Sequence, residues 1–269
     1  MRLKIWHHKN IKLVLIVVFA LSLRLWRLLS NYPIFIDEEW YVSWSEKIMK
    51  DGLHSRVHYQ GNNYLILYIL PPLNLLTLSL VFEFVGVGYL QARIMTFLFG
   101  CLVVLLTYLL AKELFDERTA LAATLLLSIS PVAITYSSTV LLGPMMLFFE
   151  LLSIIYFLRA DTDNNPKQYF ISGILASLAL LTKQFAIILY ATVILYVIFR
   201  KRRKFIHEKG LWIFLSVGII MEIIYLAIGL VVDPNSAYFG TIGHITGLHG
   251  HGPTHTPWGF WTWLRFKTV

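Results

Sequence analysis

The chain has 269 residues, of which 57% are hydrophobic, and its mean hydropathy is +0.67. This composition excludes an ordinary soluble globular domain and is typical of a membrane protein with several spans. The net charge of +8 does not indicate nucleic-acid binding, because the Lys and Arg residues gather at the ends of apolar segments, where they act as topology determinants.

The first apolar segment, residues 13–29, follows residues 1–12, which are rich in Lys and Arg. A secretory signal would begin similarly, but no small-x-small cleavage motif closes this run, and Arg24 and Arg27 interrupt its end. We therefore predict a retained helix with a cytoplasmic N-terminus.

Three consecutive acids, Asp37, Glu38 and Glu39, follow at the expected water boundary of the membrane. Helical periodicity over 34–50 separates a charged face from an aromatic and apolar face, which carries Trp40, Trp44 and Ile48 with Tyr41 beside them. This pattern predicts an amphipathic helix on the membrane surface. Ionisable residues beside a membrane are candidates for chemistry, although acids in a first turn also stabilise a helix through its dipole.

Further apolar segments follow a polar loop at 51–63, and two of them have ambiguous assignments. Residues 64–85 are interrupted by Pro71 and Pro72 and form either a span or a helix at the outer surface. Residues 169–199 would form a helix of about 46 Å, too long for a hydrocarbon core of about 30 Å. Because polar residues interrupt this segment at 182–184, we predict two short spans there. The remaining segments predict one span each: 89–111, 120–136, 144–158 and 211–232.

The basic run at 200–204 tests this arrangement. If 64–85 stays on the surface and 169–199 forms two spans, every strongly basic loop lies on the cytoplasmic side, as the positive-inside rule requires. Changing one of these two assignments alone places the run at 200–204 on the outer side, whereas changing both returns it to the cytoplasmic side. The charge pattern therefore cannot decide between the two layouts that keep the run cytoplasmic.

The predicted fold is all-α: a polytopic transmembrane helix bundle with about seven spans plus a partial one. The whole chain, 1–269, forms one transmembrane domain. Residues 31–88 form a first outer loop with juxtamembrane amphipathic helices, and 233–257 form an outer loop rich in Gly and His. A helix that begins at Trp258 reaches only about 18 Å by Val269, so the sequence predicts a C-terminally truncated chain.

Lys183 is a candidate binding residue, because apolar residues surround it in the sequence and a charge there is costly unless it meets an anion. A phosphate in the headgroup layer is the natural anion, since Lys and Arg bind phosphate well. The alternative is a lysine that snorkels to the interface, and Arg93 and Arg24 pose the same question near their own helix ends. In the predicted topology, the three acids, Lys183 and the His-rich loop all reach the outer face.

The Gly-rich outer loop carries His244, His249, His251 and His255. Clustered histidines can bind zinc or a similar metal. Their spacing does not form a recognisable closed ligand set, so we assign no metal ligand. A divalent metal stays an open alternative as a cofactor.

Six short motifs occur in a specific order along nearly the whole chain: LRLWRL, DEEWY, a proline pair, QARIMTFLFG, SISP and LASLALLTK. This order resembles the integral-membrane glycosyltransferases of the GT-C fold, within the protein O-mannosyltransferase, lipid A aminoarabinose transferase and RgtA/B/C/D-like group. Such enzymes take a sugar from a polyprenyl-phosphate carrier and transfer it to a protein, lipid or glycan acceptor at the non-cytoplasmic face of the plasma membrane or its equivalent.

The resemblance implies roles for particular residues. Asp37 and Glu38 match the catalytic D-E motif of the first outer loop, and Lys183 matches a lysine that follows a small-residue helix. Lys183, Arg93 and His255 are the candidates for binding the lipid phosphate. The family's proline pair belongs to the first outer loop, which favours the layout in which 64–85 is not a span.

Three departures from the family pattern stand out. Leu70 precedes the proline pair, where some relatives have a basic residue, and Leu142-Gly143-Pro144 stand where many relatives have an acid ahead of the phenylalanine pair. Relatives are also longer, with roughly eleven to thirteen spans of about 20 residues each.

The mechanism that these residues predict is an inverting transfer. Asp37, helped or replaced by Glu38, acts as general base on the acceptor's hydroxyl or amine, while a cation stabilises the departing lipid phosphate. Two alternatives stay open at this point: a non-enzymatic permease or metal-handling protein that uses the His-rich loop, and an inactive GT-C fragment.

Overall fold

The computed structural model describes residues 11–30, 32–59 and 62–240, and nearly all of its regular structure is helical. The only strands among these residues are β1 (Arg56–Tyr59) and β2 (Asn62–Leu65), which form an antiparallel hairpin that begins in the predicted polar loop at 51–63 and ends two residues beyond it. The helices are α1 (Ile11–Leu29), α2 (Ile36–Asp51), α3 (Ile66–Ile69), α4 (Leu73–Val85), α5 (Tyr89–Leu114), α6 (Glu117–Ile129), α7 (Pro131–Tyr136), α8 (Gly143–Asp163), α9 (Pro166–Leu180), α10 (Ile187–Lys201), α11 (Lys209–Val232) and α12 (Pro234–Tyr238).

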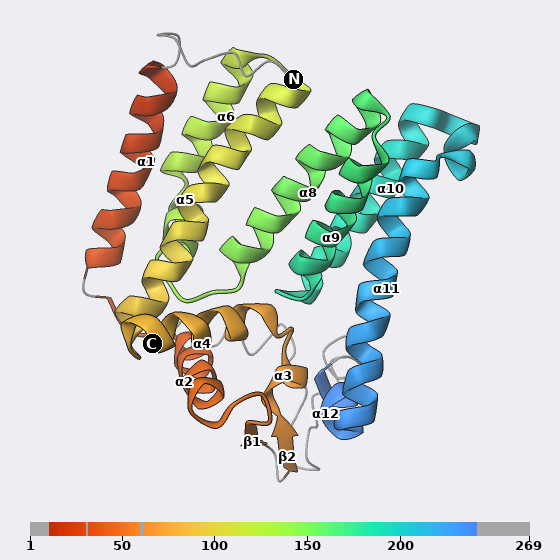
Figure 1. The fold of residues 1–269 in the computed structure, drawn as a ribbon. Coiled ribbons are helices and arrows are strands. Elements are labelled where there is room, and N and C mark those ends of the chain that lie inside the picture. Colours follow the sequence, from red (N-terminus) through yellow and green to blue (C-terminus); the bar gives the residue numbers. More distant parts are fainter. Residues whose placement is uncertain (1–10, 31, 60–61, 241–269) are drawn as a thin grey trace, which may run out of the picture.

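The long apolar helices form a bundle (Figure 1). Among the described residues, four helical segments are long and apolar enough to cross a membrane: α5, α8, α10 with the turn before it, and α11. Helices α1, α6 and α9 run alongside them in Figure 1, and α9 packs between α8 and α11. The protein is therefore a helical integral membrane protein, whereas the count of seven spans stays a prediction.

Local sequence explains where several helices start. Asp116 caps α6 by accepting a hydrogen bond from the Thr119 amide at 2.8 Å. Ser130 caps α7 in the same way, directly before Pro131, so the predicted single helix at 120–136 is divided in two. The division follows from the proline, which has no amide hydrogen and disfavours helical geometry at the residue before it.

The interruption predicted inside 169–199 is present. Helix α9 ends at Leu180, and α10 begins at Ile187 after a short 3-10 turn, Gln184–Ala186. Lys183 has extended backbone geometry at this break, with φ −159° and ψ 132°. The polar residues therefore separate two helices in place of one long helix.

Residues 64–85 also do not form a single helix. Pro71 and Pro72 separate α3 from α4, and α4 has 13 residues, which corresponds to about 20 Å and is shorter than a hydrocarbon core of about 30 Å. Figure 1 shows α4 lying across one end of the bundle, beside α2, with the hairpin and α12 near it. We call this group of elements (α2, α3, α4, α12 and the hairpin) the outer assembly, after the outer loop that the sequence predicts for most of it.

Helix α2 packs on α4 through Val42, which shares a core with Leu78 and Phe82. The buried face of α2 consists of Glu38, Val42, Ser45 and Ile48, so it differs from the predicted aromatic face. Trp40 is 42% exposed and stacks on Trp44 with 6.0 Å between ring centroids. Apolar periodicity alone cannot identify this face, because a buried glutamate, Glu38, belongs to it.

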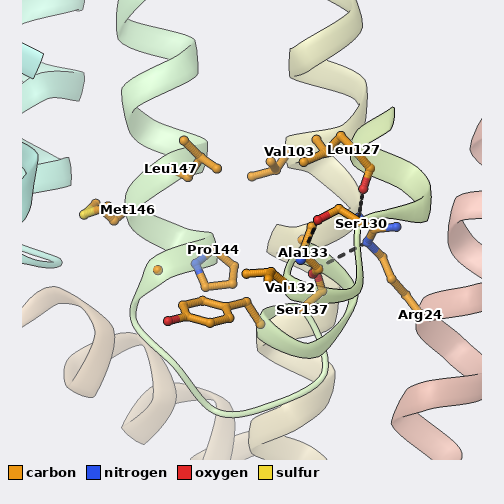
Figure 2. A pocket seen from close by; sticks show the side chains of 13 residues that line it. Arg24, Val103, Leu127, Ser130, Val132, Ala133, Ser137, Pro144, Met146 and Leu147 are labelled. Atoms are coloured by element: carbon orange, nitrogen blue, oxygen red, sulfur yellow. Dashed lines mark hydrogen bonds between the residues drawn. The ribbon is translucent and has the colours of Figure 1, made fainter. Parts of the chain in front are cut away.

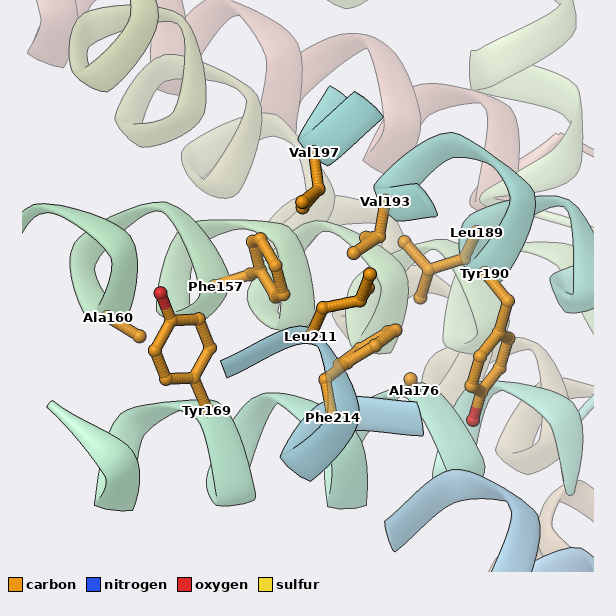
Figure 3. Packing of buried hydrophobic residues seen from close by; sticks show 10 residues of the cluster. All are labelled: Phe157, Ala160, Tyr169, Ala176, Leu189, Tyr190, Val193, Val197, Leu211 and Phe214. Atoms are coloured by element: carbon orange, nitrogen blue, oxygen red, sulfur yellow. The ribbon is translucent and has the colours of Figure 1, made fainter. Parts of the chain in front are cut away.

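A second core joins α8, α9, α10 and α11 (Figure 3). The Phe157 ring packs edge-on against Tyr169 and Phe214, with centroids 5.2 and 5.4 Å apart. A Cβ at Gly173 would lie 2.8 Å from the Phe214 carbonyl, so only glycine allows α9 and α11 to approach this closely. Small residues at contacts between apolar helices permit such close packing.

Candidate functional site

Asp37 lies in the first turn of α2, within the outer assembly, and its side chain is partly buried. In the described part of the chain, its carboxyl group has no hydrogen bond and no ion pair. Partial burial raises the pKa of Asp37 above its ordinary value, and the positive charge of Lys183 lowers it in part. The structure thus brings these two predicted site residues within electrostatic reach of each other.

Lys183 occupies the break between α9 and α10, and it is partly buried too. Its ammonium group forms no ion pair with any described residue, and its Nζ atom lies over the Phe185 ring, 5.3 Å from the ring centroid. The turn itself is well fixed, because the Leu73 amide of α4 donates to the Leu181 carbonyl at 2.8 Å. The backbone therefore attaches the Lys183 turn directly to the outer assembly.

Glu38, the neighbour of Asp37, has a different environment: it is fully buried. Its carboxylate accepts two hydrogen bonds from the Arg93 guanidinium, both 2.8 Å long, and two from the backbone amides of Phe35 and Val140, both 2.9 Å long. Burial alone raises the pKa of Glu38, but these hydrogen bonds and the Arg93 charge outweigh it, so the pKa lies below its ordinary value. Glu38 is consequently a saturated carboxylate that is held ionised.

Arg93, which belongs to α5, contacts Tyr32 in addition to Glu38. Its guanidinium lies over one face of the Tyr32 ring, 4.0 Å from the centroid, and the guanidinium of Arg27 lies 3.6 Å from the same centroid. The Tyr32 hydroxyl donates to the Ser138 carbonyl in the loop that also supplies the Val140 amide. The cluster of Glu38, Arg93, Tyr32 and Arg27 thereby joins α1, α2, α5 and the α7–α8 loop.

The two predicted catalytic acids therefore face different partners, although they are adjacent in sequence. Glu38 pairs with Arg93, a predicted phosphate ligand, whereas Asp37 is coupled to Lys183 and keeps its oxygens unpaired among the described residues. A carboxylate with open hydrogen-bonding positions can accept a proton from a bound group, and a saturated one cannot do so without losing a partner. This difference decides which acid is available for chemistry.

A small cavity of about 70 Å³ adjoins the Lys183 turn. Its wall is mostly apolar and includes Leu70 and Pro71, but it also contains Gln184 of the turn and Glu222 of α11. Sequence reasoning missed Glu222. The available signal was that Glu222 is the only charged residue between Leu211 and Val232.

A larger cavity of about 370 Å³ lies between α5, α7 and α8 (Figure 2). Val103 and Leu147 point toward one another across it, and Arg24 reaches its wall from α1. Arg24 is 1% exposed and donates to neutral acceptors, including the Leu127 and Ser128 carbonyls at 3.4 and 3.3 Å. The cavity contains none of the four predicted site residues that the structure describes, and Arg24 serves there to attach α1 to the end of α6.

His255 and the other three loop histidines, like the partial helix from Trp258, lie outside the described residues. Within the described residues, no group of three or more His, Cys, Asp or Glu side chains could hold a metal ion.

Comparison with known proteins adds the family. A sequence model described as dolichyl-phosphate-mannose-protein mannosyltransferase matches residues 70–228. An uncharacterized protein of Aquifex aeolicus (strain VF5) is 28% identical over 173 residues, which make up 64% of this chain and 34% of that protein.

Two crystal structures of ArnT from Cupriavidus metallidurans share the fold. The structure bound to undecaprenyl phosphate has a TM-score of 0.72 at 19% identity and covers 88% of this chain and 44% of ArnT; the apo structure has a TM-score of 0.69 at 18% identity and covers 91% and 45%. The chain thus spans between a third and a half of the length of these relatives. Since the family match extends over more than half of the chain, the protein belongs to the dolichyl-phosphate-mannose-protein mannosyltransferase family.

Proposed function

We propose that this protein is a membrane glycosyltransferase that moves a sugar from a polyprenyl-phosphate carrier to a hydroxyl or amine of a protein, lipid or glycan acceptor. The reaction takes place on the non-cytoplasmic face, where the outer assembly lies, and the N-terminus is cytoplasmic. Family membership supports the reaction class, and the undecaprenyl phosphate bound to ArnT supports a lipid carrier of this kind.

The observation that carries the proposal is the pairing of Asp37 with Lys183. The two side chains carry opposite charges, neither has a polar partner among the described residues, and the Lys183 charge acts on the Asp37 carboxyl group without forming an ion pair with it. Partly buried charges that are left unpaired are costly, so such a pair is typical of a site whose partners arrive with the substrate. The anionic position matches the acceptor, which has to lose a proton, and the cationic position matches the leaving phosphate.

Asp37 is the general base in this scheme. The acceptor's oxygen or nitrogen attacks the anomeric carbon, its proton passes to the Asp37 carboxylate, and the bond between that carbon and the phosphate oxygen breaks. The electron pair of this bond leaves with the polyprenyl phosphate, and attack from the opposite face inverts the anomeric configuration. The carboxylate also favours the positive charge that develops on the sugar ring.

Lys183 stabilises the phosphate as it gains charge. Glu38 and Arg93, in contrast, have a positioning role. Their bidentate pair fixes the first turn of α2, and this turn also carries Asp37, so Glu38 sets the position of its neighbour. His255 remains a further candidate for the phosphate. Because Arg93 is engaged by Glu38, we give the leading phosphate role to Lys183.

Substitution of Lys183 tests this assignment. We expect Lys183→Met to lower transfer from a polyprenyl-phosphate sugar by roughly 10²-fold, because one stabilising group at the leaving phosphate is lost. Lys183→Arg keeps the charge and should retain much of the activity. The measurement is transfer of labelled sugar in membranes that contain each variant. Wild-type activity in Lys183→Met would show that the phosphate is bound elsewhere.

The pH dependence of transfer gives an independent test of Asp37. A general base works in its ionised form, so kcat/KM should fall as the pH drops through the Asp37 pKa, which burial raises above the ordinary aspartate range. Lys183 lowers this pKa, so in Lys183→Met the same acid limb should move to higher pH. Lys183→Arg is the control and should leave the limb in place. An acid limb that is unchanged in Lys183→Met would contradict the coupling.

A further inference from the structure

Glu222 is a partly buried acid that the reaction scheme does not use. It lies in the apolar helix α11, its Oε1 atom is fully buried, and its carboxyl group has no hydrogen bond or ion pair with any described residue. The two fully buried charged side chains Glu38 and Arg24 are satisfied: Glu38 by Arg93 and two backbone amides, and Arg24 by carbonyl and hydroxyl oxygens. A buried polar atom without a partner is costly, and acids in apolar spans are typically functional.

The small cavity beside the Lys183 turn contains this acid in its wall. Its volume of about 70 Å³ has room for a hydroxyl or hydroxymethyl group. Glu222 is the only charged side chain in this wall, which is formed by Tyr68, Leu70, Pro71, Leu180, Leu181, Gln184, Glu222, Tyr225, Leu226 and Gly240.

The neighbouring polar groups are already committed or neutral. The Gln184 side-chain amide donates to the Gly240 carbonyl at 3.0 Å, and the Tyr225 hydroxyl donates to the Leu67 carbonyl at 2.9 Å. The Tyr68 ring stacks on Tyr225, with 5.3 Å between centroids, and forms a flat apolar wall. A ligand that donates a hydrogen bond would therefore satisfy Glu222 while its carbon atoms contact the apolar surface.

The cavity and the Lys183 ammonium belong to one turn, since Gln184 follows Lys183 directly and Leu181 lines the cavity. Leu181 also accepts the Leu73 amide, so the outer assembly fixes the distance between the two features. A molecule whose phosphate lies at Lys183 thus has a cavity with an unpaired acid beside the same turn.

We infer that the cavity at Glu222 is a subsite for one hydroxyl or hydroxymethyl group of a sugar that takes part in the transfer. This inference rests on the proposed function and adds a specificity-determining residue to it. The hydroxyl belongs either to the sugar on the carrier or to a glycan acceptor, and the chemistry is the same for both: an O–H group donates to the Glu222 carboxyl. Analogues without that hydroxyl leave the acid unpaired and bind less well.

Binding measurements with Glu222→Leu and Glu222→Gln test the subsite. The probes are undecaprenyl-phosphate mannose, bare undecaprenyl phosphate, and free mannotriose as a glycan, each added alone to the purified chain. If the carrier's sugar uses the subsite, Glu222→Leu should weaken undecaprenyl-phosphate mannose by roughly 10- to 100-fold and leave bare undecaprenyl phosphate unchanged. If the acceptor uses it, the loss appears with mannotriose instead. Glu222→Gln keeps a hydrogen-bond acceptor and should lose less.

One further readout and one control variant exclude a purely structural effect. Glu222→Leu removes an unpaired buried carboxyl group, so the melting temperature without ligand should rise or stay equal while sugar binding weakens. Glu83→Gln, which changes an exposed acid on α4, is the matched control and should alter neither quantity.

The results separate this inference from the proposed function. If the wild-type chain transfers sugar, Asp37→Asn does not, and both Glu222 variants bind all three probes like the wild type, the subsite is wrong and the function stands. If the wild-type chain neither binds undecaprenyl-phosphate mannose nor transfers its sugar, the function fails and the subsite fails with it. If the Glu222 variants lose as much affinity for bare undecaprenyl phosphate as for undecaprenyl-phosphate mannose, Glu222 contacts the carrier rather than a sugar. This result would overturn the inference.

Discussion

We expect Asp37→Asn to lower sugar transfer by roughly 10²- to 10⁴-fold, the usual contribution of a general base. Asparagine has nearly the shape of aspartate but cannot take the acceptor's proton. Because no described residue forms a hydrogen bond or ion pair with the Asp37 side chain, the change should leave folding intact. The measurement is transfer from a labelled polyprenyl-phosphate sugar, with the melting temperature of each purified variant recorded beside it.

Glu39→Gln provides the matched control for this prediction. Glu39 lies two residues further along α2, in the same first turn, and its side chain is exposed. The substitution therefore removes one negative charge from this turn without changing a residue of the site. Its activity should equal that of the wild type. Full activity in Asp37→Asn, in Glu38→Gln and in the double variant would remove both acids from the mechanism.

Arg93→Met should destabilise the protein by about 3–5 kcal/mol, because it leaves a fully buried carboxylate without its charged partner. The Glu38 pKa is lowered in the folded protein, so the stability that Glu38 contributes is present above the ordinary glutamate pKa and is lost as the pH falls through the folded-state value. The difference between Arg93→Met and the wild type should therefore shrink at acidic pH. Denaturant unfolding in detergent at several pH values measures it.

The double variant Glu38→Leu with Arg93→Met distinguishes a pair effect from a general packing effect. It removes both charges together, so it should be more stable than Arg93→Met alone, although the Phe35 and Val140 amides then lose their acceptor. Losses that simply add would show that Glu38 and Arg93 do not act as a unit.

Much of the arrangement follows from local sequence. The polar residues at 182–184 predicted the break that separates α9 from α10, and the proline pair marked the place where 64–85 is interrupted, although the residues alone left a span open there. The acids at the start of α2 were identified as a group. Each of these signals acts within a few residues, which is why sequence alone is sufficient to find it.

The division of labour between the two acids could not be predicted in this way. Glu38 is saturated by Arg93, 55 residues away, and by the Val140 amide, 102 residues away, so only the tertiary fold distinguishes it from Asp37. The buried face of α2 could not be predicted for the same reason. It includes Glu38 because the Arg93 guanidinium and two backbone amides form hydrogen bonds with this carboxylate. The hairpin could not be predicted either: its strands have four residues each, and most of it lies in the segment 51–63, whose polar composition predicts a loop.

The attachment of Glu38 has a consequence for how the reaction partners meet. Four hydrogen bonds connect this residue to the segment before α2, to α5 and to the loop before α8, so the first turn of α2 cannot swing independently of the bundle. Asp37 is therefore a stationary group. Under the proposed function, the lipid-linked sugar and its acceptor therefore have to travel to Asp37, and the mobility that the reaction needs belongs to those two molecules.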